Sequence, residues 1–114
     1  MITLPWPPKE LNPNKRLHWA VRNPHKVIYR DACHLLTYNA KLSVPDEGPI
    51  PITVDFYPPD RRHRDDDNMI SSFKAGRDGI ANALGVNDRR FQPVYRFNDP
   101  VKGGRIVVTL GGQG

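Results

Sequence analysis

The pattern of apolar positions predicts four strands and two helices in the order β-α-β-α-β-β. Short alternating apolar runs predict strands at residues 2–6, 52–57, 94–97 and 105–110. Helical spacing of apolar residues predicts helices at residues 25–42 and 67–85. Residues 98–104 are rich in turn-forming types, which favours an antiparallel hairpin between the last two strands. We therefore expect an α/β (α+β) domain with a small mixed sheet and two principal helices.

Each predicted helix has an apolar stripe that would face the core. In the first helix the stripe consists of Ile28, Ala32, Leu35 and Leu42. In the second helix it consists of Met69, Phe73, Gly76, Ile80 and Leu84. Gly76 and Gly79 weaken the second helix, so they indicate a close approach of another backbone. Asp67 or Asn68 suits the capping position at its start, and Gly85 suits the left-handed position after its end.

The length of 114 residues allows one domain, residues 1–114, of which residues 111–114 are expected to form a loose tail. Cys33 is the only cysteine, so an intramolecular disulfide is excluded and a reducing compartment is expected. No window approaches the roughly 18 apolar residues of a membrane span, and the start lacks the features of a leader. We expect a soluble cytoplasmic protein with no membrane partner.

An excess of basic residues narrows the choice of partner. Lysine and arginine number 17 against 12 aspartate and glutamate, which gives a net charge of +5. This balance favours a polyanion as partner, although many proteins carry such a charge only for solubility. Lys15, Arg16 and Arg22 stand beside His18 and Trp19, which suits contact with a sugar-phosphate backbone and stacking on an exposed base. A polar loop with Trp19 packed on the core explains the same pattern equally well.

The candidate catalytic residues are concentrated in residues 61–68, where three arginines are followed by three consecutive aspartates. In an extended segment Asp65 and Asp67 point the same way, and Asp88 can join them if the fold brings it near. Mg²⁺ prefers oxygen ligands, so these carboxylates are candidate metal ligands beside a scissile phosphodiester. The alternative is an exposed loop in which arginines neutralise the acids, with Asp67 as a helix cap. The nearby cations that are candidates for contacting DNA are Arg61, Arg62, Arg64, Arg89 and Arg90.

Lys74 is the candidate catalytic cation. On the predicted second helix it shares a polar face with Asp67, Ser71 and Asp78. A cation fixed there can stabilise the charge of a pentavalent transition state or protonate the leaving oxygen. The alternative is a solvated side chain that pairs with Asp78 one helical turn further on.

Three short motifs stand in a characteristic order along the chain. They are Leu4-Pro-Trp-Pro-Pro8, the segment PDRRHRDDDN at residues 59–68, and Asn87-Asp88, with a lysine between the last two. Together they resemble the RusA family of Holliday-junction resolvases. The resemblance implies a homodimeric, Mg²⁺-dependent crossover junction endodeoxyribonuclease that cuts four-way DNA junctions by paired symmetric nicks in recombination and repair. It implies that Asp65, Asp67 and Asp88 are the catalytic metal ligands, that Lys74 is the essential lysine, and that the gene comes from a phage or prophage in a bacterial host.

The spacing of the lysine departs from that family's pattern. In the family the lysine follows the second aspartate by four residues, whereas Lys74 stands seven residues after Asp67. The offset is about one helical turn, which keeps the helix face and moves the side chain by roughly 5 Å along the axis. Arg77 and Arg64 are alternatives for the same role. Two other functions stay open: a nucleic-acid-binding protein without catalysis, and a nuclease for flaps, forks or other branched DNA.

Overall fold

Strand β2 (Ile50–Tyr57) is the centre of the sheet, because it pairs with a neighbour along each edge. The other elements are β1 (Ile2–Pro5), the 3-10 helix η1 (Lys9–Leu11), α1 (Trp19–Asn39), α2 (Asp66–Ser72), α3 (Lys74–Leu84), the 3-10 helix η2 (Asp88–Arg90), β3 (Phe91–Phe97) and β4 (Arg105–Leu110). In the computed structural model, which describes residues 1–111, the sheet has the order β1–β4–β2–β3. β2 runs parallel to β3 and antiparallel to β4, which in turn runs antiparallel to β1.

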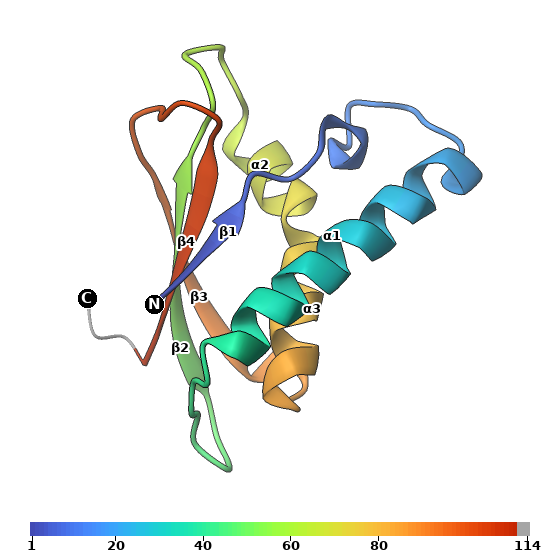
Figure 1. Ribbon diagram of the computed structural model, residues 1–114. Helices are drawn as coiled ribbons and strands as arrows, with labels where there is room; N and C mark the ends of the chain where they lie inside the picture. The colour runs from blue at the N-terminus through green and yellow to red at the C-terminus, as the bar shows by residue number, and fades with distance from the viewer. Residues whose placement is uncertain (112–114) are drawn as a thin grey trace.

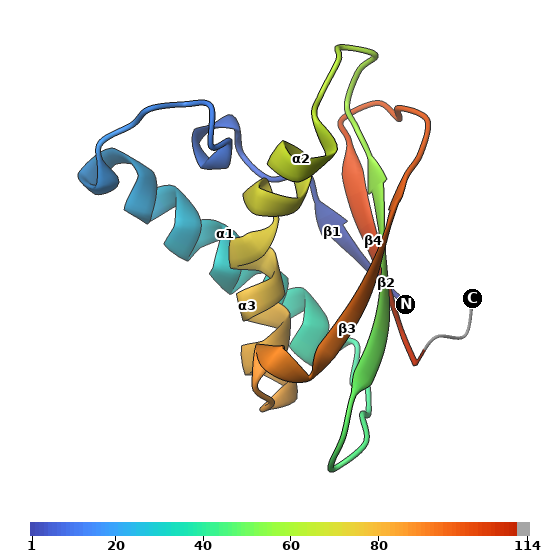
Figure 2. The same cartoon turned by 180° about the vertical axis from the view of Figure 1, so that it is seen from behind.

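The described helices lie on one face of this mixed sheet (Figure 1), and the opposite face carries no helix (Figure 2). The inner face is apolar along every strand, and its most deeply buried side chains are Leu4, Ile50, Ile52, Val54, Phe56, Ile106 and Val108. The predicted α+β class with a mixed sheet is therefore confirmed. The tail predicted at residues 111–114 lies, apart from Gly111, outside the described residues.

The predicted hairpin between the last two strands is wrong, because β3 and β4 lie on opposite sides of β2. The connection between them passes the end of β2. There the amide of Asn98 donates to the Phe56 carbonyl over 2.9 Å. The amide of Val101 donates to the Pro58 carbonyl over 2.8 Å. β2 is buried along its apolar face, and a neighbouring strand on each side satisfies its backbone hydrogen bonds. The connection from β3 to β4 is long enough to cross the end of β2.

Helix α1 begins and ends earlier than predicted, and it buries a different face. It runs through Pro24, although a proline removes one backbone hydrogen bond. The buried residues are Tyr29, Cys33 and Thr37, whereas the predicted core residues Ile28 and Leu35 are 68% and 58% exposed. Tyr29 fixes this rotation, because its hydroxyl donates to the Pro5 carbonyl at the end of β1 over 2.6 Å. The outer face of α1 therefore exposes apolar side chains, among them Ile28 and Leu35.

The predicted second helix is divided at Phe73 into α2 and α3. Phe73 is buried and packs edge-on against Phe56 with ring centroids 6.1 Å apart. The prediction that another backbone approaches the glycines is confirmed for Gly79, because a Cβ there would collide with the carbonyl oxygen of Arg30 in α1. A Cβ on Gly76 would meet the rings of Phe73 and Tyr29. Small residues on α3 therefore let the two helices pack at close range.

Two further predictions concern the thiol and the membrane. Cys33 is fully buried, and burial raises the pKa of its thiol to about 11. The thiol therefore stays protonated and acts as a packing group. Within residues 1–111, no helix is long and apolar enough to cross a membrane.

Candidate active site

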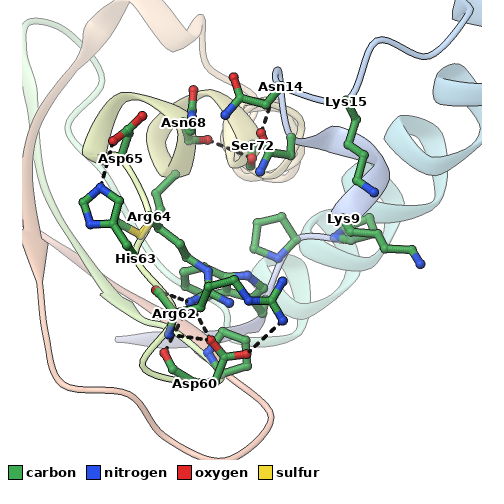
Figure 3. Close-up of a pocket in the computed structure, with 16 residues that line it drawn as sticks. Lys9, Asn14, Lys15, Asp60, Arg62, His63, Arg64, Asp65, Asn68 and Ser72 are labelled. Atoms are coloured by element: carbon green, nitrogen blue, oxygen red, sulfur yellow. Dashed lines mark hydrogen bonds and ion pairs between the residues drawn. The ribbon is translucent and has the colours of Figure 1, made fainter.

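Two segments that are far apart in the sequence form a cleft of about 490 Å³ beyond the carboxyl ends of β1 and β2. One segment follows β1 and includes η1, and the other is the β2–α2 loop with the start of α2. The polar residues that line the cleft are Lys9, Asn12, Asn14, Lys15, Asp60, Arg62, His63, Arg64, Asp65, Asn68 and Ser72. Asp65 and His63 lie on one side of it, with Lys9 and Lys15 on the opposite side (Figure 3). The cleft is thus a basic hollow with a carboxylate at its wall.

Arg64 holds the β2–α2 loop in shape. Its Nη1 donates to Asp60 Oδ1 over 2.9 Å and to the carbonyl oxygens of Asp60 and Arg62 over 3.2 and 3.0 Å. Its guanidinium also lies 5.8 Å from the centroid of the Trp6 ring. The hydrogen bond from Arg64 lowers the pKa of the Asp60 carboxyl, helped by the Arg62 amide. The Arg64 guanidinium is therefore bonded within the loop. Because it holds the loop in shape, it is a poor candidate to replace the catalytic lysine.

Two carboxylates line the cleft, and within the described residues Asp65 is the one that has no arginine partner, because Asp60 pairs with Arg62 and Arg64. Asp65 is the N-cap of α2, with φ −74° and ψ 138°, and its side chain makes no capping hydrogen bond. Its Oδ1 lies 3.2 Å from His63 Nε2, and two-thirds of the side chain is exposed, at 66%. The prediction that Asp67 or Asn68 caps this helix is wrong by two or three residues.

Of the three consecutive aspartates, Asp65 alone lines the cleft. Asp66 and Asp67 are the first residues of α2, so the segment is not extended and residues two apart do not share a face. Asp66 lines a separate hollow beside Phe97 and Asn98. Asp67 is exposed and does not line the cleft. The prediction that Asp65 and Asp67 converge because they lie in an extended segment is therefore wrong in its premise. The two residues belong instead to the first turn of α2.

Asp88 is the first residue of η2, which follows the end of α3 that is far from α2. The chain from α2 through α3 can be followed in Figure 1. The intervening helix α3 alone is about 16 Å long. Arg77 Nη2 donates to the Asp88 carbonyl over 3.0 Å, and Arg77 Nε lies 4.0 Å from its carboxylate. Among residues 1–111, no three His, Cys, Asp or Glu side chains gather closely enough to hold a metal ion. A single chain thus does not bring Asp88 to Asp65 and Asp67.

Lys74 is the first residue of α3, and its exposed side chain lines a second cleft that contains Asp78 rather than Asp65. Arg77, the other alternative for its role, is engaged with Asp88 and lies 3.4 Å from the Tyr95 hydroxyl. The structure therefore leaves Lys74 as the accessible cation of this helix but does not place it beside Asp65.

Most of the cations predicted to contact DNA are exposed, namely Lys15, Arg16, Arg61, Arg62 and Arg89. Arg64 is bonded within the β2–α2 loop. Arg22 instead donates to the carbonyls of Asn12 and Lys15, and Arg90 donates to those of Pro45 and Gly48, so both stabilise loops. Trp19 is 72% exposed on the first turn of α1, which excludes the alternative in which it packs on the core.

Sequence reasoning missed several residues of the first cleft. They are Lys9, Asn12, Asn14, His63, Asn68 and Ser72. The signal that could have found the first three is their place directly after the Pro7-Pro8 pair, which carries the chain from the end of β1 across the cleft. The others flank the aspartates in the sequence, so proximity to Asp65 was the available clue.

The fold and the cleft define a small α+β protein with an acidic residue in a basic hollow, an arrangement suited to nucleic acid. No protein-family model matches the chain. An uncharacterized protein of Xylella fastidiosa is 44% identical over 115 residues, covering 97% of this chain and 75% of that protein. The crossover junction endodeoxyribonuclease RusA of Escherichia coli K12 is 34% identical over 116 residues, covering 96% of this chain and 91% of RusA. Its counterpart in Enterobacteria phage 82 is 31% identical with the same coverage. The chain therefore belongs to the RusA family of crossover junction endodeoxyribonucleases.

Proposed function

We propose that the protein is a Mg²⁺-dependent endonuclease that resolves four-way DNA junctions by paired symmetric nicks, in recombination and repair within a bacterial cell. Two relatives at 34% and 31% identity carry the name of that activity. The observation that carries the proposal here is Asp65, a carboxylate at the wall of a cleft whose other charged lining residues include Lys9, Lys15 and Arg62.

The cations of the cleft hold the DNA backbone. Lys9, Lys15 and Arg62 are exposed and line the same hollow, so each can contact a phosphate without breaking an internal hydrogen bond. Only a weak ion pair of Arg62 with Asp60, at 3.8 Å, would have to yield. Such contacts supply affinity and position the phosphodiester, but they carry no sequence information.

In this proposal Asp65, at the wall of the cleft, and Asp67, from the adjoining helical turn, are the residues that would hold a Mg²⁺ ion. Such an ion commonly binds one or two protein carboxylates and fills its remaining positions with water and substrate phosphate. When bound, the ion polarises a phosphoryl oxygen and helps to generate the attacking hydroxide. His63 limits the rotation of the Asp65 carboxylate through the 3.2 Å contact with Oδ1. Attack by water in line with the leaving oxygen leaves a 5′-phosphate and a 3′-hydroxyl.

Asp88 contributes, in this proposal, from a second protomer. It lies beyond α3 from Asp65 in its own chain, so a homodimer is the arrangement that lets Asp88 of the partner subunit approach the same phosphodiester. A dimer also places two equivalent sites about a twofold axis, which matches the symmetry of a four-way junction and of two paired nicks.

The outer face of α1 is the surface we assign to the homodimer. Val21, Ile28 and Leu35 are 52%, 68% and 58% exposed, and their spacing of seven residues places them on one face of the helix. If two copies of α1 pair antiparallel about Ile28, Val21 lies opposite Leu35 of the partner subunit. The same register brings His25 opposite Asp31 of the partner subunit, so the polar flanks complement each other as well.

The experiment that tests the function is incubation of the purified protein with end-labelled four-way junction, fork and linear duplex, in Mg²⁺ or in EDTA. The proposal predicts paired symmetric nicks in the junction only, and only with Mg²⁺. Cutting of the fork in preference would assign the enzyme to other branched DNA. Tight binding without nicks under every condition would assign it to non-catalytic DNA binding.

A further inference from the structure

A second cleft of about 260 Å³ lies between the first half of α1 and the junction of α2 with α3. Its charged lining residues are Arg22, Lys26, Arg30, Lys74 and Asp78. Four cations therefore face one carboxylate. Hydrogen-bonding groups are added by Asn23, Ser71 and Ser72, and apolar lining by Leu11, Pro13, Val27 and Ala75.

The spacing of the cations along α1 lowers the stability of that helix. Arg22, Lys26 and Arg30 follow one another at intervals of four residues on α1, and like charges at that spacing destabilise an isolated helix. Lys74 approaches the same cleft from α3 and adds to the repulsion. A bound polyanion would remove that penalty, because an opposite charge stabilises each cation in turn.

Two of these cations are free to bind. Within residues 1–111, neither Lys26 nor Lys74 makes an ion pair. Arg30 has only an exposed pair with Asp31, its sequence neighbour, at 3.5 Å. Arg22 is fixed by its bonds to loop carbonyls, so it contributes charge but few new hydrogen bonds.

We propose that this second cleft binds a phosphate of the DNA backbone, and that it continues the track of the first cleft along the junction. Ser72 lines both clefts, so they adjoin at the end of α2. The cations Lys9, Lys15 and Arg62 of the first cleft then lead to Lys26, Arg30 and Lys74 of the second. The apolar lining suits the deoxyribose between successive phosphates. The inference rests on the proposed function and names Lys26 and Arg30 as phosphate-binding residues.

The test is the salt dependence of junction binding. Each phosphate contact that is lost lowers the slope of log K against log salt by about 1. We expect Lys26→Ala to raise the Kd of a four-way junction several-fold and to lower that slope by about 1. Lys26→Glu should raise the Kd further. Arg105→Ala is the matched control, because it removes one exposed positive charge near Tyr57, on the sheet face that carries no helix.

The outcomes separate this inference from the proposed function. Equal Kd values and equal slopes for Lys26→Ala and Arg105→Ala would overturn the second cleft as a phosphate site, even if the wild-type protein nicks the junction. A loss specific to Lys26→Ala and Lys26→Glu supports the site, even if the wild-type protein binds the junction without nicking it. Thermal unfolding of each variant confirms that the comparison is made between folded proteins.

Discussion

Asp55 and Arg96 form a two-point ion pair across the parallel strands β2 and β3. Arg96 Nε donates to Asp55 Oδ1 over 2.7 Å and Nη2 donates to Oδ2 over 2.9 Å, and the two residues are direct neighbours in the strand register. Asn98 adds a third bond to Asp55 Oδ1 over 3.1 Å. Asp55 is 5% exposed on the sheet face that carries no helix. The pair therefore fastens the edge strand β3, which follows η2 and its first residue Asp88, to the centre of the sheet.

Removing this pair should destabilise the protein in a pH-dependent way. The hydrogen bond from Arg96 is the main reason that the pKa of Asp55 is lowered. A carboxyl whose folded pKa is depressed stabilises the fold above its unfolded pKa of about 4. That stability is lost as the pH falls through the lower folded pKa. We expect Arg96→Ala to lower the free energy of unfolding at pH 7, because the buried Asp55 carboxylate loses its partner.

Denaturant unfolding at pH 7 and at pH 2–3 measures this effect. The difference between wild type and Arg96→Ala should shrink as the pH falls, because protonation of Asp55 removes the ion pair from the wild type. A difference that is unchanged between the two pH values would contradict the assignment. Arg105→Ala is a suitable control on the same sheet face, because it has no contact with Asp55 among the hydrogen bonds and ion pairs of residues 1–111.

If the apolar outer face of α1 forms the proposed dimer interface, a charge placed on that face should separate the two subunits. Ile28→Glu places a charge at the centre of the proposed helix pair, where each copy would face its own mutation. We expect this variant to elute as a folded monomer whose mass, measured by light scattering, is half that of the wild type. Val94→Glu is the control, because Val94 is 59% exposed on β3 and away from that surface. Dissociation by Val94→Glu with an intact Ile28→Glu dimer would place the interface on β3 instead.

A mixing experiment tests whether Asp88 acts across the dimer. Asp65→Asn and Asp88→Asn should each abolish cutting when alone, because every site then lacks one carboxylate. In a mixed dimer, one site would combine both substitutions and the other would combine neither. We expect the refolded mixture to regain cutting as single nicks rather than paired ones. Failure to regain any nicks, with mixed dimers present by native mass spectrometry, would place both residues at one site of the same chain or outside the site.

The sequence was most informative where one residue type is required by local geometry. Gly79 had to be small because the Arg30 carbonyl lies against it, and Gly85 had to tolerate the left-handed φ of 68° that ends α3. It was least informative where two faces of a helix are equally apolar. Ile28 and Leu35 were predicted to face the core, yet Tyr29 and Cys33 do so, because the hydroxyl of Tyr29 meets the end of β1. Only the tertiary contact decides between such stripes.

In the candidate site, too, local features could be predicted from the sequence and features that depend on the tertiary fold could not. The position of Asp65 beside cations followed from a continuous segment of sequence, and the structure places it in a basic cleft. The position of Asp88 depends on the length of α3 and on the strand order, which a single sequence does not encode locally. The same limit explains the wrong hairpin, since turn residues predict a turn but not which strands pair across it.

The most direct measurement is the rate of junction nicking in three variants that each remove one negative charge from the same helical turn. Asp65→Asn and Asp67→Asn should lower the nicking rate by roughly a hundredfold or more, because each removes a carboxylate from the proposed metal site, while junction binding persists. Asp66→Asn should cut at close to the wild-type rate, because Asp66 lines a different hollow. Retained cutting by Asp65→Asn, or an equal loss in all three variants, would contradict the account.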